Sequence, residues 1–149
     1  MKTSAGLLPF RRESGLEVLI AHPGGPFWAR KDLGAWSVIK GEIDPGEEPL
    51  VAAVREFSEE TGWPAPVAVD YLDLGSAELK SGKVIRCWAF EADFDPTTLV
   101  PGTFPARIAG RTVVVPEIDR VAWMTPAEAA DRLNAAQVPF VERLALALA

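Results

Sequence analysis

Cysteine, histidine and long apolar runs are scarce in this chain of 149 residues. The one cysteine, Cys87, excludes an intrachain disulfide and fits a reducing compartment, and its strand-like surroundings predict a buried thiol. The one histidine, His22, lies among turn-forming residues without the spacing of a metal ligand, so we expect a structural or surface role. No apolar run reaches the roughly 20 residues that cross a bilayer, and the N-terminus lacks a secretory signal pattern. We therefore expect a cytoplasmic protein that does not bind membranes.

Basic residues are also in the minority, with 15 Lys and Arg against 21 Asp and Glu, which gives a net charge of −6. Such a balance argues against extended nucleic-acid binding, because that function needs a basic surface. A small anionic substrate remains compatible with the composition if a metal ion supplies the positive charge. The length predicts a single domain over residues 1–149, and a hydrophobic content of 48% is ample for a packed core.

The pattern of apolar residues predicts an α+β fold with a mixed sheet. Strands are expected over residues 4–10, 16–21, 36–39, 67–79, 83–94, 111–115 and 120–124. Helices are expected over residues 49–61, 125–133 and 138–148. Ser81-Gly82 predicts a hairpin turn, and residues 96–110 are expected to form a loop.

The expected helix at residues 49–61 is acidic on one side. Pro49 suits its first turn, and Gly62 suits the position just past its end. Glu56, Glu59 and Glu60 are neighbours on one side, and like charges at this spacing repel by roughly 0.2–0.5 kcal/mol per pair. The cluster is either a solvated acidic face or a site for a hard cation such as Mg²⁺, Mn²⁺ or Ca²⁺. The opposite side is apolar and comprises Leu50, Ala53, Val54 and Phe57.

The segment before this helix favours the cation site. Gly41 and the turn Asp44-Pro45-Gly46 form a loop whose backbone can approach a metal or a phosphate closely. Lys40 precedes the loop and can neutralise phosphate oxygens. Arg55 lies beside the acidic cluster and can hold a carboxylate in bidentate geometry.

Residues 41–63 match the Nudix box at its defining positions, which are Gly41, Glu47, Arg55, Glu56, Phe57, Glu59, Glu60, Gly62 and Trp63. The chain therefore resembles the Nudix hydrolases, a family that cleaves nucleoside diphosphates linked to another group and uses a divalent metal. The resemblance implies the Nudix fold, an α/β/α sandwich around a mixed sheet. It also implies Mg²⁺ or Mn²⁺ as the cofactor and a small-molecule nucleotide as the substrate.

The matched positions carry implied roles around that metal. Arg55 is expected to orient the carboxylates, and Glu47 is expected to lie behind the metal ligands or to bind through water. The general base differs between branches of the family, so that role stays open. The expected metal ligands are Glu56, Glu59, Glu60 and the backbone carbonyl of Gly41.

Glu117 shares the candidacy for general base with Glu56. It lies in an expected loop after a strand, six residues before Trp123. Many Nudix enzymes bring a further glutamate from this region to the metals or to the attacking water, and the spacing to the tryptophan resembles that of diadenosine tetraphosphate hydrolases. The alternative is an exposed loop carboxylate. Asp119 is the weaker candidate from the same loop.

Aromatic and basic residues before the box are candidates for substrate binding, because aromatics stack on bases and cations meet phosphates. Residues 36–41 resemble the lead-in of the diadenosine polyphosphate branch, with Ile39 where proline is usual. The alternative for each aromatic is core packing. Lys80, Lys83 and Arg86 near the hairpin could reach distal phosphates, although a solvated hairpin tip is favoured. The substrate-binding candidates are Trp28, Arg30, Lys31, Trp36 and Lys40.

The sequence thus predicts a Mg²⁺- or Mn²⁺-dependent Nudix hydrolase in which water attacks a phosphorus of a pyrophosphate linkage. Diadenosine polyphosphates are the leading substrates, and house-cleaning of nucleoside triphosphates comes second. ADP-ribose and capped or triphosphorylated RNA follow. A binding module of the Nudix fold that senses nucleotides without cleaving them is the alternative from another class.

Overall fold

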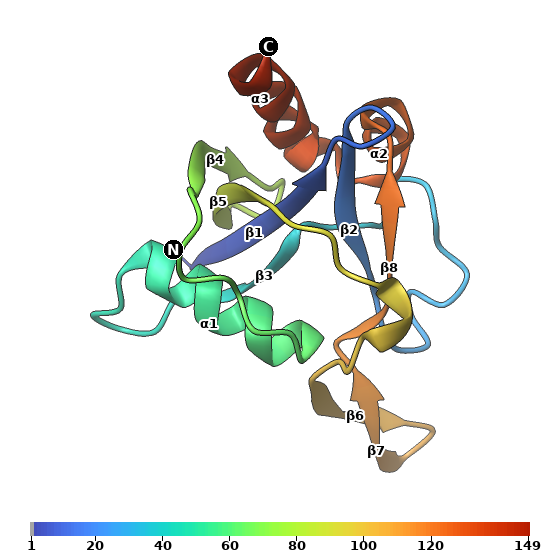
Figure 1. Ribbon diagram of the computed structural model, residues 1–149. Coiled ribbons are helices and arrows are strands. Elements are labelled where there is room, and N and C mark those ends of the chain that lie inside the picture. Colours follow the sequence, from blue (N-terminus) through green and yellow to red (C-terminus); the bar gives the residue numbers. More distant parts are fainter. Residues whose placement is uncertain (1) are drawn as a thin grey trace.

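A computed structural model describes residues 2–149, and its centre is a mixed six-stranded sheet (Figure 1). The strand order is β4-β5-β1-β2-β8, and β3 pairs with β1. The β1–β5 pair is parallel, whereas the other pairs of this sheet are antiparallel. The six strands are β1 (Thr3–Arg11), β2 (Glu17–Pro23), β3 (Ile39–Glu42), β4 (Leu72–Glu78), β5 (Val84–Glu91) and β8 (Ile118–Met124).

Helices cover both faces of this sheet, which gives the expected α/β/α sandwich. Helix α1 (Pro49–Thr61) lies on one side, and α2 (Pro126–Arg132) and α3 (Val138–Leu148) lie on the other (Figure 1). Successive strand residues point to opposite faces, so Leu7 packs in the core under α1 and Leu8 packs in the core under α3. Cys87 is buried in the second of these cores, as expected, and burial raises the pKa of its thiol.

The sequence signals at the ends of the helices are confirmed. Pro49 occupies the first turn of α1, and Gly62 ends the helix with a φ of 76°, a left-handed conformation that glycine adopts without steric cost. At α2, Thr125 and Glu128 form a complete capping box. The helix that carries the acidic cluster therefore begins and ends where local chemistry dictates.

Three expectations about strands are wrong. Residues 96–110 were expected to be a loop, but β6 (Thr103–Ile108) pairs with β7 (Arg111–Pro116) in a separate two-stranded sheet that projects from the body (Figure 1). Its turn uses positive φ at Ala109 and Gly110, and prolines within the segment hid the strand pattern.

The other two errors concern strand limits. The strand expected at residues 36–39 instead forms β3 at Ile39–Glu42, and Trp36 makes only an isolated bridge to Leu133. The strand expected from residue 67 begins at Leu72, because Val67 is 95% exposed and pairs with no strand. The hairpin turn at Gly82 is confirmed by its positive φ and by its place between β4 and β5. Within residues 2–149, no helix combines the length and the apolar character needed to cross a bilayer.

Candidate metal and phosphate site

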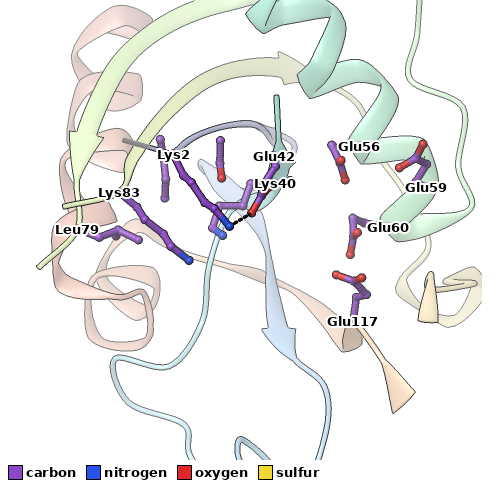
Figure 2. Close-up of a pocket in the computed structure, with 12 residues that line it drawn as sticks. Lys2, Lys40, Glu42, Glu56, Glu59, Glu60, Leu79, Lys83 and Glu117 are labelled. Carbon is purple, nitrogen blue, oxygen red and sulfur yellow. Dashed lines mark ion pairs between the residues drawn. The ribbon is translucent and has the colours of Figure 1, made fainter. Parts of the chain in front are cut away.

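A pocket of about 410 Å³ lies between α1, β3 and the ends of β1 and β5, and we call it the phosphate pocket. Its two sides carry opposite charge (Figure 2). Glutamates form one side, and three of them come from a single helix, α1. Lysines from separate segments form the other side. The charged lining residues are Glu56, Glu59, Glu60 and Glu117 on the acidic side, with Lys2, Lys40, Lys83 and Glu42 on the other.

Glu60 and Glu117 face each other in this pocket (Figure 2). Glu60 is only 8% exposed, whereas Glu117 is exposed at the junction of β7 and β8. Burial and, to a smaller extent, the neighbouring carboxylates of Glu117 and Glu56 together raise the pKa of Glu60 to about 8. A carboxyl group in these surroundings holds a proton or needs a cation beside it.

Arg55 organises the other carboxylates of the cluster. Its Nε and Nη2 donate to the two oxygens of Glu47 at 2.8 and 2.9 Å, which is a bidentate pair. Its Nη1 donates to Glu56 at 2.9 Å and to Glu59 at 3.1 Å. Binding by Arg55 lowers the pKa of Glu47 to about 2, so Glu47 acts as an anchor for the guanidinium behind the pocket.

Gly41 lies directly against Glu56. A Cβ atom at this position would lie 2.0 Å from the carboxyl carbon and from Oε2 of Glu56. Gly41 pairs with Ala5 across β3 and β1, so its backbone has little room to withdraw. Only glycine therefore lets the Glu56 carboxylate lie on the β3 backbone, where the expected carbonyl ligand is located.

These residues fit a hard divalent cation. The donors are all oxygens, which Mg²⁺ and Mn²⁺ prefer. Burial and the negative charge of neighbouring glutamates raise the pKa of Glu60, and a cation at this point would stabilise its ionised form. Within residues 2–149, no group of three acidic, histidine or cysteine side chains already surrounds one point as metal ligands. Arg55 bonds to one oxygen of Glu56 and one oxygen of Glu59, so the second oxygen of each carboxylate is available to a metal.

The lysines on the other side suit an anion. Burial lowers the pKa of Lys40, and the charge of Lys83 lowers it further. Lys2 has a partner in Glu42 at 3.4 Å. The positive charges of Lys40 and Lys83 repel each other, and phosphate oxygens between them would relieve that repulsion.

A second cavity of about 310 Å³, which we call the aromatic pocket, adjoins the phosphate pocket. The two share Lys40, Glu60, Leu79 and Glu117 as lining residues. The remaining wall of the aromatic pocket is largely apolar and includes Trp28, Trp36, Val38 and Ile118, with Asn134 and Gln137 as polar groups. An elongated ligand could thus place phosphates in one cavity and a ring in the other.

The substrate-binding candidates from the sequence divide into two groups. Lys40, Trp28 and Trp36 line the cavities. Trp36 is only 3% exposed, and its Nε1 donates to Asp32 at 2.7 Å, so core packing accounts for most of its surface.

The structure does not bring Arg30 and Lys31 to either pocket. Lys31 instead places its Nζ 3.8 Å from the ring centroid of Phe27. Asp119, the weaker acidic candidate, also lies outside the lining of both pockets and bonds to His22.

Sequence reasoning undervalued Lys83 and missed Asn134 and Gln137. A solvated hairpin tip was favoured for Lys83, but parallel pairing of β5 with β1 brings this residue to the pocket. Nothing in the sequence indicates that pairing. Gln137 is 2% exposed, and its side chain bonds to the backbone of Val38 and to Ser37, contacts that only the tertiary fold creates.

Comparison with known proteins gives a consistent picture. A family model described as NUDIX domain matches residues 2–144. The RNA pyrophosphohydrolase of Cereibacter sphaeroides is 44% identical over 63 residues, which cover 40% of this chain and 38% of that protein. The putative 8-oxo-dGTP diphosphatase of Bacillus subtilis is 49% identical over 39 residues, which cover 26% of each. The chain thus spans well under two thirds of such curated relatives, with matches that cover 23% to 42% of their length.

Among solved structures, the Ap4A hydrolase binary complex of C. elegans has a TM-score of 0.71 and 19% identity, and the alignment covers 97% of both chains. At that identity the likeness concerns the fold, and it extends over almost the entire chain.

Proposed function

Because this chain belongs to the NUDIX domain family, we propose that it hydrolyses a phosphoric anhydride bond in a nucleoside polyphosphate, with diadenosine polyphosphates as the favoured substrates. The observation that carries the proposal is the junction of the two cavities at Lys40, Glu60 and Glu117. A nucleotide that spans them would place its phosphates between the lysines and the glutamates. Cleavage would then occur beside the acidic cluster.

The residues of the phosphate pocket divide the chemical work. Lys40 and Lys83 bind the oxygens of the polyphosphate and set its position. Glu56, Glu59 and Glu60 hold Mg²⁺ or Mn²⁺, with the Gly41 carbonyl as a further ligand. When bound, the metal supplies positive charge that stabilises the phosphoryl oxygens as negative charge develops on them.

Glu117 is the better of the two candidates for the general base. Burial raises the pKa of Glu56, but this carboxylate already accepts from Arg55 through one oxygen and is assigned to the metal. Glu117 has no ion pair with a Lys or Arg within residues 2–149 and is exposed to water at the junction of the cavities. A carboxylate there can accept a proton from the attacking water.

The preference for diadenosine polyphosphates rests on the aromatic residues at the mouth of the aromatic pocket. Trp28 lines that pocket, and Phe27 packs edge-to-face on Trp28 with the ring centroids 4.9 Å apart. Phe27 is 66% exposed, so it offers a second stacking surface outside the pocket. One nucleoside would occupy the pocket, and the second would stack on Phe27.

A single nucleoside triphosphate is the second candidate substrate. The aromatic pocket, at about 310 Å³, has room for one nucleoside beside the phosphate pocket. The Bacillus subtilis relative is named for a substrate of this class. A nucleotide substrate and the single cysteine are both in keeping with the cytoplasmic location that we propose.

A substrate panel with Mg²⁺ tests the proposal, with products identified by chromatography. The panel contains diadenosine tetraphosphate, ATP, 8-oxo-dGTP, ADP-ribose and a 5′-triphosphorylated RNA oligonucleotide. We expect diadenosine tetraphosphate to give ATP and AMP, with kcat/KM at least tenfold above any single triphosphate. A tenfold preference for a single triphosphate would favour the second candidate. Binding without hydrolysis of any member would favour a nucleotide-sensing module and contradict the enzymatic proposal.

A further inference from the structure

His22 is fully buried and connects two segments that wall the aromatic pocket. It lies at the end of β2, where the pairing with β8 shifts register between His22 and Pro23. Its Nε2 lies 2.6 Å from the backbone carbonyl of Lys31, and its Nδ1 lies 2.9 Å from Oδ1 of Asp119. A carbonyl oxygen only accepts, so Nε2 carries a proton and donates it to Lys31. The side chain thus bonds to a loop at one end and to β8 at the other.

Both bonded segments carry residues of the aromatic pocket. The N–H of Lys31 donates to the carbonyl of Trp28 at 2.9 Å, so the turn that His22 holds is the turn that bears Trp28. Asp119 directly follows Ile118, which lines the pocket from β8. Neither Lys31 nor Asp119 lines the pocket itself. His22 therefore acts on the pocket through the separation of Trp28 and Ile118, and its ring also meets the ring of Trp36 edge-on, with the centroids 5.2 Å apart.

The segment between β2 and β3 depends on such bonds because it forms no helix or strand. Its other backbone anchors lie near its two ends, and an ion pair of 3.5 Å joins Asp32 to Arg132. The N–H of Gly24 donates to the carbonyl of Glu117 at 3.0 Å, and the N–H of Gly34 donates to the carbonyl of Asp131 at 3.1 Å. Asp32 accepts from Trp36 at 2.7 Å. The bond from the fully buried His22 to the Lys31 carbonyl anchors the segment beside Trp28.

We propose that His22 is a positioning residue that fixes the width of the aromatic pocket and thereby the affinity for the nucleoside part of the substrate. The inference rests on the proposed function, because it assigns the nucleoside to this pocket. It assigns no contact between His22 and the substrate. The phosphate pocket, which His22 does not touch, should be independent of it.

Two variants test the two hydrogen bonds of His22 separately. The side-chain amide nitrogen of asparagine reaches about as far as Nδ1 of histidine, and that of glutamine reaches about as far as Nε2. His22→Asn therefore keeps a polar group beside Asp119 and Arg120 and loses the bond to the Lys31 carbonyl. His22→Gln keeps the Lys31 bond and loses the bond to Asp119. Because Asp119 is already held in β8, we expect the loop end to matter more.

The measurements compare a ligand with a nucleoside and one without. KM and kcat are measured for diadenosine tetraphosphate, and the inhibition constant is measured for inorganic tripolyphosphate, which has only phosphates. We expect His22→Asn to raise KM about tenfold, and His22→Gln at most about threefold. In both variants, kcat and the inhibition constant of tripolyphosphate should stay within about threefold of the wild-type values. An unchanged KM in His22→Asn, or equal changes in KM and in the tripolyphosphate constant, would overturn the proposal.

Arg143→Ala is the control for simple loss of stability. Arg143 donates to the carbonyls of Leu74 and Ser76, which joins α3 to β4 outside both pockets. This variant should lower Tm and leave KM unchanged. A rise in KM that matches His22→Asn would show that destabilisation alone moves KM, and would overturn the assignment to His22.

A measurement on the wild-type protein does not depend on whether a variant folds. Because His22 is the only histidine, its ring protons are assigned without ambiguity. We expect a resolved, slowly exchanging Nε2 proton in the NMR spectrum, and a rapidly exchanging one would contradict the buried bond. Should the wild type hydrolyse nothing in the panel, the proposed function fails separately. The dissociation constants of ATP and tripolyphosphate, measured for wild type, His22→Asn and His22→Gln, then test the role of His22.

Discussion

The carboxyl groups of Glu60 and Glu117 face each other in one pocket, although one comes from α1 and the other from the junction of β7 and β8. Burial raises the cost of ionising Glu60, and the nearby carboxylate of Glu117 adds to that cost. Without a counter-charge this arrangement destabilises the fold. Its presence beside two more glutamates is the strongest structural argument for a cation at this site.

Replacement of Glu60 by glutamine should separate function from stability. Glu60→Gln removes one ligand charge, so we expect kcat to fall by about 10²–10⁴, the loss typical of an important electrostatic or acid–base group. Tm in excess chelator should not fall, because the change also removes repulsion with Glu117. Steady-state kinetics and thermal unfolding measure the two effects. Wild-type activity in the variant would exclude Glu60 as a ligand.

Replacement of Glu117 tests its role with the attacking water. Glu117→Gln should lower kcat and leave the Mg²⁺ concentration for half-maximal rate nearly unchanged, since the α1 glutamates remain. Glu78→Gln, an exposed carboxylate on β4 outside both pockets, is the matched control. A wild-type kcat in Glu117→Gln would show that Glu117 is an exposed carboxylate without a catalytic role, and Glu56 would remain as the candidate base.

Gly41→Ala should act through Glu56. The added methyl group would occupy the space of the Glu56 carboxyl group, so we expect that side chain to be displaced and kcat to fall by about 10² or more. Kinetics of the double variant Gly41→Ala, Glu56→Gln supply the check. If both changes remove the same interaction, their effects are far from additive. Independent, additive losses would show that Gly41 matters for another reason.

Glu47 should stabilise the fold in a pH-dependent way. Its pKa is lowered to about 2 by Arg55 and by the N–H of Asp44, and the ordinary value is about 4.3. A carboxyl group whose pKa is lowered in the folded protein stabilises the fold at pH values above the ordinary pKa. This stabilisation is lost as the pH falls through the lowered pKa, which is about 2 for Glu47. The difference in unfolding free energy between wild type and Glu47→Gln should therefore shrink from pH 6 toward pH 2.5. Urea unfolding across this range measures it, and a constant difference would contradict the Arg55–Glu47 account.

The sequence predicted the parts of this site that lie close together in the chain. Pro49 and Gly62 define α1 by local chemistry, so the relative positions of Glu56, Glu59 and Glu60 on it followed directly. Glu117 was a candidate through its loop position after a strand and its spacing to Trp123, and the structure places it opposite Glu60.

What the sequence could not predict depends on long-range pairing. Lys83 reaches the pocket because β5 lies parallel to β1, and no local signal encodes that partner. Lys31 was expected to bind substrate because of its charge, but its ammonium group lies over Phe27. The backbone carbonyl of Lys31, rather than its side chain, connects this residue to the aromatic pocket, because the carbonyl accepts a hydrogen bond from His22.

The central claim is that the acidic cluster serves a metal that the hydrolysis of a phosphoric anhydride requires. The most direct measurement is the rate of diadenosine tetraphosphate hydrolysis by wild type and Glu60→Gln, each in Mg²⁺ and in excess chelator. The account predicts ATP and AMP from the wild type in Mg²⁺, no product in chelator, and a rate at least about 10² lower in the variant. Undiminished hydrolysis by the wild type in excess chelator would contradict it.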